Sequence, residues 1–190
     1  MRPWKPIILS EFPVAATRLA FVAAGTVRYR SFAAQYQQSP IPLGGAIIKR
    51  DWLRYYERGE EPAKFQYVIQ SWDTANKSGE LNDFSVCTTW GVHHKFYYLL
   101  HVSRKRLNFP ELKHEARRLF AQFKPHKVLI EDKASGTQLL QSLKDDGLYR
   151  VTPYSPPAGS DKAMRLHAQS ALFENGSVFY RKALRGSPNT

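Results

Sequence analysis

The chain contains little cysteine and little negative charge. Cys87 is the one cysteine among 190 residues, which excludes an internal disulfide and a cysteine-rich zinc site and suits a reducing compartment. Lys and Arg number 28 against 16 Asp and Glu, so the formal net charge is +12. Such an excess of positive charge attracts phosphate groups and favours nucleic acid as a partner. The simpler alternative is a basic surface with no specific partner.

Long apolar runs and nucleotide-binding motifs are also missing. No stretch is apolar for long enough to cross a membrane. The opening segment, residues 1–10, is interrupted by Pro3 and Pro6 and makes a poor secretory signal. The pattern G-x-x-x-x-G-K-[ST] does not occur, so ATP hydrolysis by a phosphate-binding loop is not expected. We therefore expect no membrane partner and a cytoplasmic location.

The composition suits one folded domain preceded by an arm. Hydrophobic residues make up 43% of the chain and aromatic residues 13%, enough to form a core. Residues 1–64 show no sustained period, although weak patterns predict helices over residues 14–24 and 29–38. We interpret residues 1–64 as an N-terminal arm and linker and residues 65–190 as the compact domain.

Strands and helices alternate in a regular order after residue 65. Three strands joined by tight turns come first and predict an antiparallel meander, whereas the later strands return through helices, which favours parallel pairing. The expected fold is α/β: an RNase H-like mixed sheet with helices on both faces. The predicted strands cover residues 67–73, 84–92, 96–102, 127–132, 149–153 and 177–180, and the predicted helices cover residues 110–123, 137–146 and 161–175.

Two acidic residues stand at the ends of predicted buried strands. Asp73 ends the strand over residues 67–73, and Glu131 ends the apolar run of the strand over residues 127–132. In this topology the two strands are neighbours, so their carboxyl ends converge. Paired carboxylates are ligands for Mg²⁺ or Mn²⁺, and in a two-metal nuclease Asp73 would bridge the ions while Glu131 binds one from the side. The alternative is a helix cap or a salt bridge to a lysine such as Lys133.

A third acidic ligand is harder to identify. Asp161 has the position of a helix cap. Asp83 begins the second strand at the far end of the hairpin, and Asp132 points away from Glu131 if the strand continues. None of the three is a convincing ligand. Ser135 lacks a histidine–acid partner pair and is better explained as part of a turn at the start of a helix.

Basic residues flank the expected metal site. Lys133, Lys162 and Arg165 are predicted to contact DNA phosphates, and the alternative is a solvated basic surface. The run Arg104–Arg106 is expected to form a loop after the third strand, where it either contacts the DNA backbone or forms a charged turn.

Several segments of the chain resemble the C-terminal nuclease domain of tailed-phage terminase large subunits. The likeness extends from about residue 32 to residue 180. The segments that carry it are Phe32–Gln38, Gln70–Ala75, Asn82–Gly91, Leu129–Thr137, Asp161–Arg165 and Phe173–Gly176.

The resemblance implies a function for the chain. Family members package viral DNA, and their RNase H-like domain cuts double-stranded DNA with Mg²⁺ or Mn²⁺ inside the bacterial host. They work with a small terminase subunit and a portal. Asp73 and Glu131 match two of the family's acidic metal ligands. The expected function is therefore a metal-dependent DNA endonuclease domain of a phage or prophage packaging terminase.

Two departures from the family pattern accompany this resemblance. The N-terminal ATPase of the family is missing, and no aspartate follows Asp161, where the family places a further acidic motif. The chain is therefore expected to be truncated at both ends relative to the family. An alternative function is a catalytically weak or inactive remnant that only binds DNA or a packaging partner. A resolvase or transposase with the same fold is a third possibility.

Overall fold

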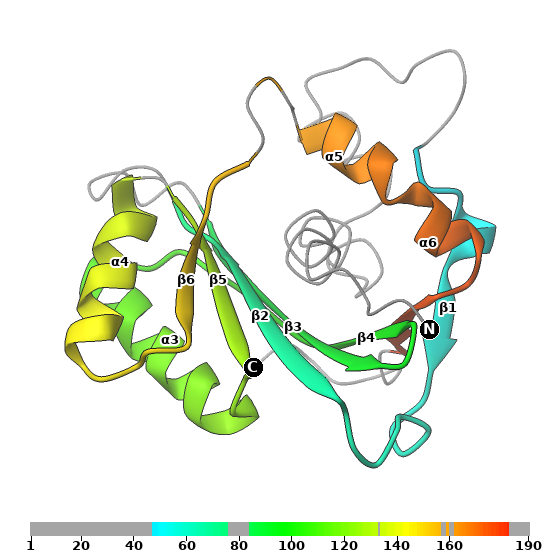
Figure 1. Ribbon diagram of the computed structural model, residues 1–190, viewed down its shortest axis with the longest axis horizontal. Coiled ribbons are helices and arrows are strands. Elements are labelled where there is room, and N and C mark those ends of the chain that lie inside the picture. The colour runs from blue at the N-terminus through cyan, green and yellow to red at the C-terminus, as the bar shows by residue number, and fades with distance from the viewer. Residues whose placement is uncertain (1–46, 76–83, 133, 157–158, 160–161, 183–190) are drawn as a thin grey trace, which may run out of the picture.

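The computed structural model describes residues 47–75, 84–132, 134–156, 159 and 162–182, and these form a sheet with helices on both sides (Figure 1). The helices predicted over residues 14–24 and 29–38 lie outside the described residues. Helices α3 and α4 cover one face of the sheet, and α5 and α6 lie on the other side (Figure 1). Among the described helices, none is both long and apolar enough to cross a membrane.

Seven strands of the described residues form one mixed sheet in the order β1-β7-β4-β3-β2-β5-β6. Strands β2, β3 and β4 pair antiparallel as the predicted meander, and β5 pairs parallel with β2. Strands β6 and β7 pair parallel with β5 and β4. The predicted RNase H-like order is confirmed. The strands are Arg54–Tyr56 (β1), Tyr67–Asp73 (β2), Ser85–His93 (β3), Phe96–Lys105 (β4), Lys127–Glu131 (β5), Val151–Tyr154 (β6) and Val178–Arg181 (β7).

Two strands differ from the prediction in ways that matter. Strand β4 continues to Lys105, so most of the run predicted as a loop, Arg104–Arg106, is strand. Its pairing with the start of β3 supplies the hydrogen bonds that extend it. Strand β1 lies in the predicted arm and pairs with β7 at the sheet edge, where Tyr56 is buried and its hydroxyl donates to the carbonyl of Leu99. The division of the chain at residue 65 stays a prediction.

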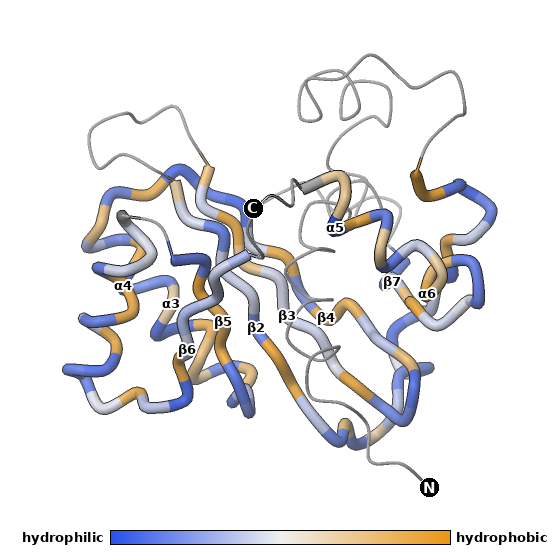
Figure 2. The backbone as a smooth tube through the Cα atoms, turned by 45° about the horizontal axis from the view of Figure 1, so that its top comes forward, coloured by the Kyte–Doolittle hydropathy of each residue, from blue (hydrophilic) through white to orange (hydrophobic). Residues whose placement is uncertain are grey.

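Helix α3 (Phe109–Phe123) begins at a complete capping box. The Asn108 side chain accepts a hydrogen bond from the Glu111 backbone, and the Glu111 side chain accepts one from the Asn108 backbone. Pro110 lies in the first turn, where no intrahelical donor is lost. The helix ends at Lys124 in the left-handed conformation (φ 45°). Hydrophobic and hydrophilic residues alternate along α3 and α4 (Figure 2), as expected for helices that bury one side.

The segment predicted as one helix over residues 161–175 contains two short helices, α5 (Lys162–Ala168) and α6 (Ser170–Glu174). Gln169 interrupts them with backbone angles of φ −101° and ψ 0°. Around it the backbone hydrogen bonds join residues three apart, from Gln169 to Leu166 and from Leu172 to Gln169. This tightened turn lets both helices bury an apolar side chain, Leu166 and Phe173, in the same cluster.

The two faces of the sheet have separate apolar clusters. Trp72, Cys87 and Ile130 pack with residues of α3 and α4 such as Leu119. The residues of the other cluster, such as Ile69 and Leu129, pack with Leu166 and Phe173 of α5 and α6. Strand alternation therefore assigns each side chain to one of two environments, which we call the α3 face and the α5 face.

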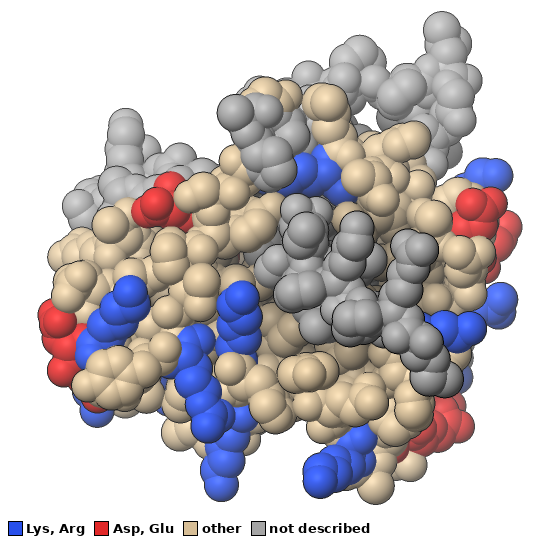
Figure 3. All heavy atoms as spheres, viewed as in Figure 1, with Lys and Arg blue, Asp and Glu red and all other residues tan. Residues whose placement is uncertain are grey.

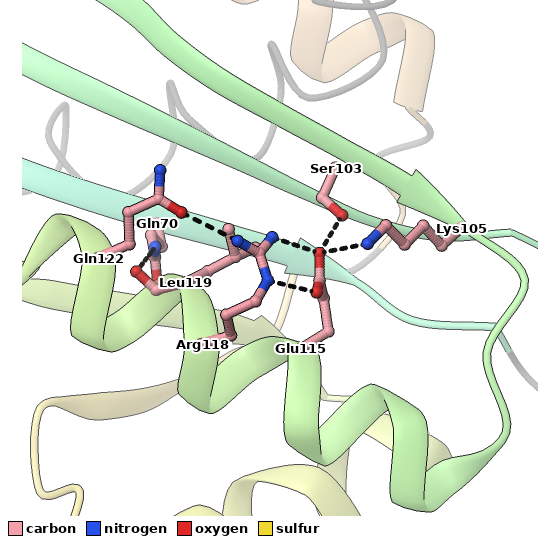
Figure 4. Close-up of polar contacts among 7 residues, drawn as sticks. All are labelled: Gln70, Ser103, Lys105, Glu115, Arg118, Leu119 and Gln122. Atoms are coloured by element: carbon pink, nitrogen blue, oxygen red, sulfur yellow. Dashed lines mark hydrogen bonds and ion pairs between the residues drawn. The ribbon is translucent and has the colours of Figure 1, made fainter. Parts of the chain in front are cut away.

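A buried carboxylate links α3 to the sheet on the α3 face (Figure 4). Glu115 is 5% exposed. Its carboxylate accepts hydrogen bonds from Arg118 Nε and Nη2 at 2.8 and 2.9 Å and from Ser103 Oγ at 2.8 Å, and Lys105 Nζ lies 3.1 Å away. Chiefly because of the bonds from Arg118, the pKa of Glu115 falls to about 2. A buried charge supported in this way stabilises the fold only while it is ionised.

We expect Glu115→Gln to unfold more easily at neutral pH. The pKa of Glu115 lies below its usual value of 4.5 in the fold, so its contribution is complete above about pH 4.5 and disappears as the pH falls toward 2. A shift of this size corresponds to a free energy on the order of 3 kcal/mol. Urea unfolding at pH 7 and pH 3 measures it, with Glu174→Gln, an exposed residue, as control. If the unfolding free energies of parent and variant differed equally at both pH values, the ionised Glu115 carboxylate would not be the source of this stability.

Candidate metal centre

Asp73 and Glu131 end neighbouring strands. Strand β2 pairs parallel with β5, and the last paired residues are Trp72 and Ile130. Asp73 and Glu131 are the next residue on each strand, at the same edge of the sheet. Neighbouring strands lie about 4.8 Å apart, so the two carboxylates start from adjacent backbone positions. The sequence prediction that these strands are neighbours is confirmed.

Both acidic side chains belong to the α5 face. Trp72 and Ile130 lie in the apolar cluster of the α3 face, and Leu129, two residues before Glu131, lies in the cluster of the α5 face. Since successive residues alternate, Asp73 and Glu131 share the α5 face. Glu131 is 3% exposed and Asp73 is half-buried. Two carboxylates on one face of neighbouring strand ends, one of them buried, are a suitable donor set for a hard divalent cation.

Helix α4 (Ala134–Asp145) is held against the ends of both strands. The hydroxyls of Thr74 and Ser135 are hydrogen-bonded at 2.8 Å, and Ser135 Oγ also donates to the carbonyl of Ala75. Gly136 lies so close to β5 that a Cβ there would collide with the carbonyl oxygen of Glu131. Ser135 therefore connects the start of α4 to the end of β2, which agrees with its interpretation as part of a helix-start turn.

Asp132 is separate from the acidic pair. Its backbone N–H donates to the carbonyl of Tyr154 at 2.9 Å, so the pairing with β6 continues one residue past Glu131. Its exposed carboxylate accepts a hydrogen bond from Thr137 Oγ1 at 2.7 Å. Asp132 thus supports the first turn of α4, in keeping with the expectation that it is no partner of Glu131 in the metal site.

The other residues predicted for the site are only partly placed. Arg165 lies on α5 and is half-buried. Lys133, Asp161 and Asp83 lie outside the described residues, as does the side chain of Lys162. The expectation that the second strand begins at the far end of the hairpin from Asp73 is wrong, because β3 pairs antiparallel with β2 and Val86, near its start, lies opposite Asp73. Within the described part of the chain, no group of three or more His, Cys, Asp or Glu residues could hold a metal ion. The roles of Asp73, Glu131, Lys133, Lys162 and Arg165 therefore stay predictions.

The order of strands and the acidic strand ends agree with a comparison against family models. The model described as "Terminase RNaseH-like domain" matches residues 70–187, which is more than half of the chain. The chain belongs to this terminase family. The match confirms the resemblance drawn from the sequence and favours it over a resolvase or a transposase. No curated protein sequence matched the chain.

Solved terminase structures share the fold of this terminase domain. The large terminase nuclease from thermophilic phage G20c with bound magnesium superposes with a TM-score of 0.55 at 14% identity, covering 74% of this chain and 76% of that one. The same nuclease with bound cobalt gives a TM-score of 0.55 at 15% identity, with the same shares of both chains.

The large terminase of another thermophilic bacteriophage gives a TM-score of 0.53 at 11% identity. The match covers 71% of this chain and 32% of the other, so the present chain corresponds to about a third of that protein. At such identities these likenesses support the RNase H-like fold of the terminase domain.

We expect Gly136→Ala to destabilise the terminase domain by displacing the start of α4 from the end of β5. The new methyl group would push the start of α4 away from the Glu131 carbonyl, and overpacking of this kind costs about 2 kcal/mol of unfolding free energy. Thermal unfolding measures the loss. Gln138→Ala, at an exposed position of the same helix, should unfold like the parent. A Gly136→Ala protein as stable as the parent would show that α4 does not need this close approach.

Proposed function

We propose that the chain is the metal-dependent DNA endonuclease domain of a phage or prophage packaging terminase large subunit. The observation that carries this proposal is the placement of Asp73 and Glu131 on one face at the ends of paired strands β2 and β5 in a terminase RNaseH-like domain. Nuclease domains of this fold have been solved with bound magnesium and cobalt. Their metals support divalent-ion binding by the acidic pair of this chain.

The residues present fit a Mg²⁺ or Mn²⁺ site. Asp73 and Glu131 would hold the ion, because the half-buried carboxylate of Asp73 ends β2 and the buried carboxylate of Glu131 ends the neighbouring strand β5. When bound, such ions supply an activated water and stabilise the leaving oxygen of a phosphodiester. The chain contributes the two carboxylates and the buried position of Glu131.

The proposed substrate is double-stranded DNA, held mainly through its phosphates. The net charge of +12 supports this, and Lys and Arg side chains gather over the lower left of the face shown in Figure 3, where β5 and β6 begin. Near the carboxylates, the proposed phosphate contacts are Lys133, Lys162 and Arg165. By family, the further partners proposed are a small terminase subunit and a portal, in the cytoplasm of the bacterial host.

A second candidate is a remnant that binds DNA or a packaging partner and cuts poorly. The small number of ligands favours this candidate. Among the described residues, Asp73 and Glu131 end neighbouring strands, and no group of three or more His, Cys, Asp or Glu residues could hold a metal ion. Two ions about 4 Å apart repel each other unless enough carboxylates neutralise them. The rate of plasmid cleavage separates the two candidates, because the remnant would cut slowly or not at all.

We expect Asp73→Asn to abolish cleavage of plasmid DNA in Mg²⁺ or Mn²⁺. The amide keeps the shape of the side chain but removes a charge that the cation requires, so the rate should fall at least 100-fold, about 2.7 kcal/mol of transition-state stabilisation. Asp132→Asn is the matched control, because the same substitution next to Glu131 preserves the acceptor for Thr137. Undiminished cleavage by Asp73→Asn, or by the parent chain in EDTA, would remove Asp73 from the chemistry.

We expect the chain to bind duplex DNA with little sequence preference and with strong salt dependence. Each neutralised phosphate adds roughly 0.9 to the magnitude of the slope of log K against log salt concentration. Fluorescence anisotropy with two duplexes of unrelated sequence, from low to moderate salt in EDTA, measures both properties. A slope near zero, or a large affinity difference between the duplexes, would contradict binding through the phosphate backbone.

A further inference from the structure

A row of side chains crosses four strands at the carboxylate end of the sheet. Asp73 of β2 pairs with Val86 of β3, and Val86 pairs with Arg104 of β4. Glu131 stands on the other side of Asp73, on β5. Two strand spacings separate the backbone of Arg104 from that of Asp73, a distance of about 10 Å. The cationic residue therefore lies level with the acidic pair along the strands.

Contacts of its neighbours show which face Arg104 occupies. Ser103 and Lys105 both reach Glu115 of α3 (Figure 4), so they lie on the α3 face. Val102, two residues before Arg104, packs against the cluster of the α5 face. Because side chains alternate along β4, Arg104 points to the α5 face, which is the face of the acidic pair.

An aromatic ring holds Arg104 and a second arginine together. The guanidinium carbon of Arg104 lies 3.2 Å from the centre of the Phe84 ring, and that of Arg106 lies 4.5 Å away. Phe84 precedes β3, at the end of the sheet where β4 finishes. Stacking on a ring restrains a guanidinium in one orientation. Two guanidinium groups are thus gathered on one ring, at the same end of the sheet as the acidic pair.

We propose that Arg104, Arg106 and Phe84 form a clamp for a backbone phosphate of the DNA strand that is cut. This inference rests on the proposed endonuclease function and names the residues that position its substrate. Guanidinium groups match phosphate oxygens with two parallel hydrogen bonds, and Phe84 lowers the entropy that the arginines lose on binding. The clamp lies about two strands from Asp73, so it holds a phosphate next to the scissile one rather than the scissile phosphate itself.

The test compares two double variants with the same net charge. Arg104→Gln/Arg106→Gln removes the clamp, and Lys105→Gln/Lys144→Gln removes two charges from the side of α3 and α4. Anisotropy with a duplex in EDTA should show at least a tenfold loss of affinity for the arginine variant. Its salt slope should fall in magnitude by about 0.9, because one phosphate is no longer neutralised. The lysine variant should keep the parental slope.

Two single variants test the geometry. Arg104→Lys keeps the charge but loses the planar fork, so its affinity should lie between those of the parent and the double variant. Phe84→Leu keeps all the charges and should still weaken binding, which a purely electrostatic surface would not do. Circular dichroism and thermal unfolding verify that each variant is folded. If a variant is unfolded at 25 °C, binding is measured at a lower temperature at which its spectrum matches that of the parent.

The outcomes separate the clamp from the endonuclease function. Equal losses for the arginine and lysine double variants, or parental binding by the arginine variant, overturn the clamp even if the parent cuts DNA. A selective loss in the arginine variant supports the clamp even if the parent does not cut. Where the parent cuts, the arginine variant should raise KM at least tenfold and change kcat much less, because binding of a neighbouring phosphate is lost throughout the reaction.

Discussion

The parallel pairing of β2 with β5 is the contact on which the proposed site depends. It joins segments that are more than fifty residues apart and places Trp72 opposite Ile130. A shift of one residue would turn one carboxylate to the α3 face and leave it among apolar side chains. The register is secured by burial, because Trp72 and Ile130 belong to one apolar cluster and Ile69 and Leu129 to the other. The hydrophobic core therefore also determines where the acidic side chains lie.

Helix α4 adds a second constraint at the same edge. Its first turn bonds to Thr74 and Ala75 after β2 and lies directly against the backbone of Glu131 at the end of β5. One helix thus connects the two strand ends that carry the acids. A metal site needs ligands whose positions are set before the ion arrives, and polar bonds between a hydroxyl and the backbone provide this without adding charge. Ser135, which in isolation is compatible with a nucleophile, has this connecting role in the structure.

The separation of the two faces also distributes the charges. On the α3 face, Glu115 is paired with Arg118 and Lys105 and stabilises the packing of the helix. On the α5 face, the two acids of β2 and β5 stand in line with Arg104 of β4. The successive residues Arg104 and Lys105 therefore have different surroundings, although their charges and their sequence neighbourhood are alike. Alternation along a strand is sufficient to direct Lys105 to Glu115 of α3 and Arg104 toward the proposed DNA path.

Local patterns determined most of the fold. Strand β2, helix α3 and strand β5 could be predicted from an apolar run, a proline in the first turn and acidic strand ends, because these signals lie within a few residues of each other. The same patterns named Asp73 and Glu131 as a pair.

Other features required the tertiary structure. The pairing of β1 with β7 and the extension of β4 to Lys105 depend on hydrogen bonds to distant strands, and the break at Gln169 depends on packing into a shared cluster. The stack of Arg104 and Arg106 on Phe84 joins residues about twenty positions apart. The sequence by itself determined which side chains could do chemistry, because that is a property of residue type and local spacing. Only the tertiary structure decided which of them share a face, since this depends on the strand register.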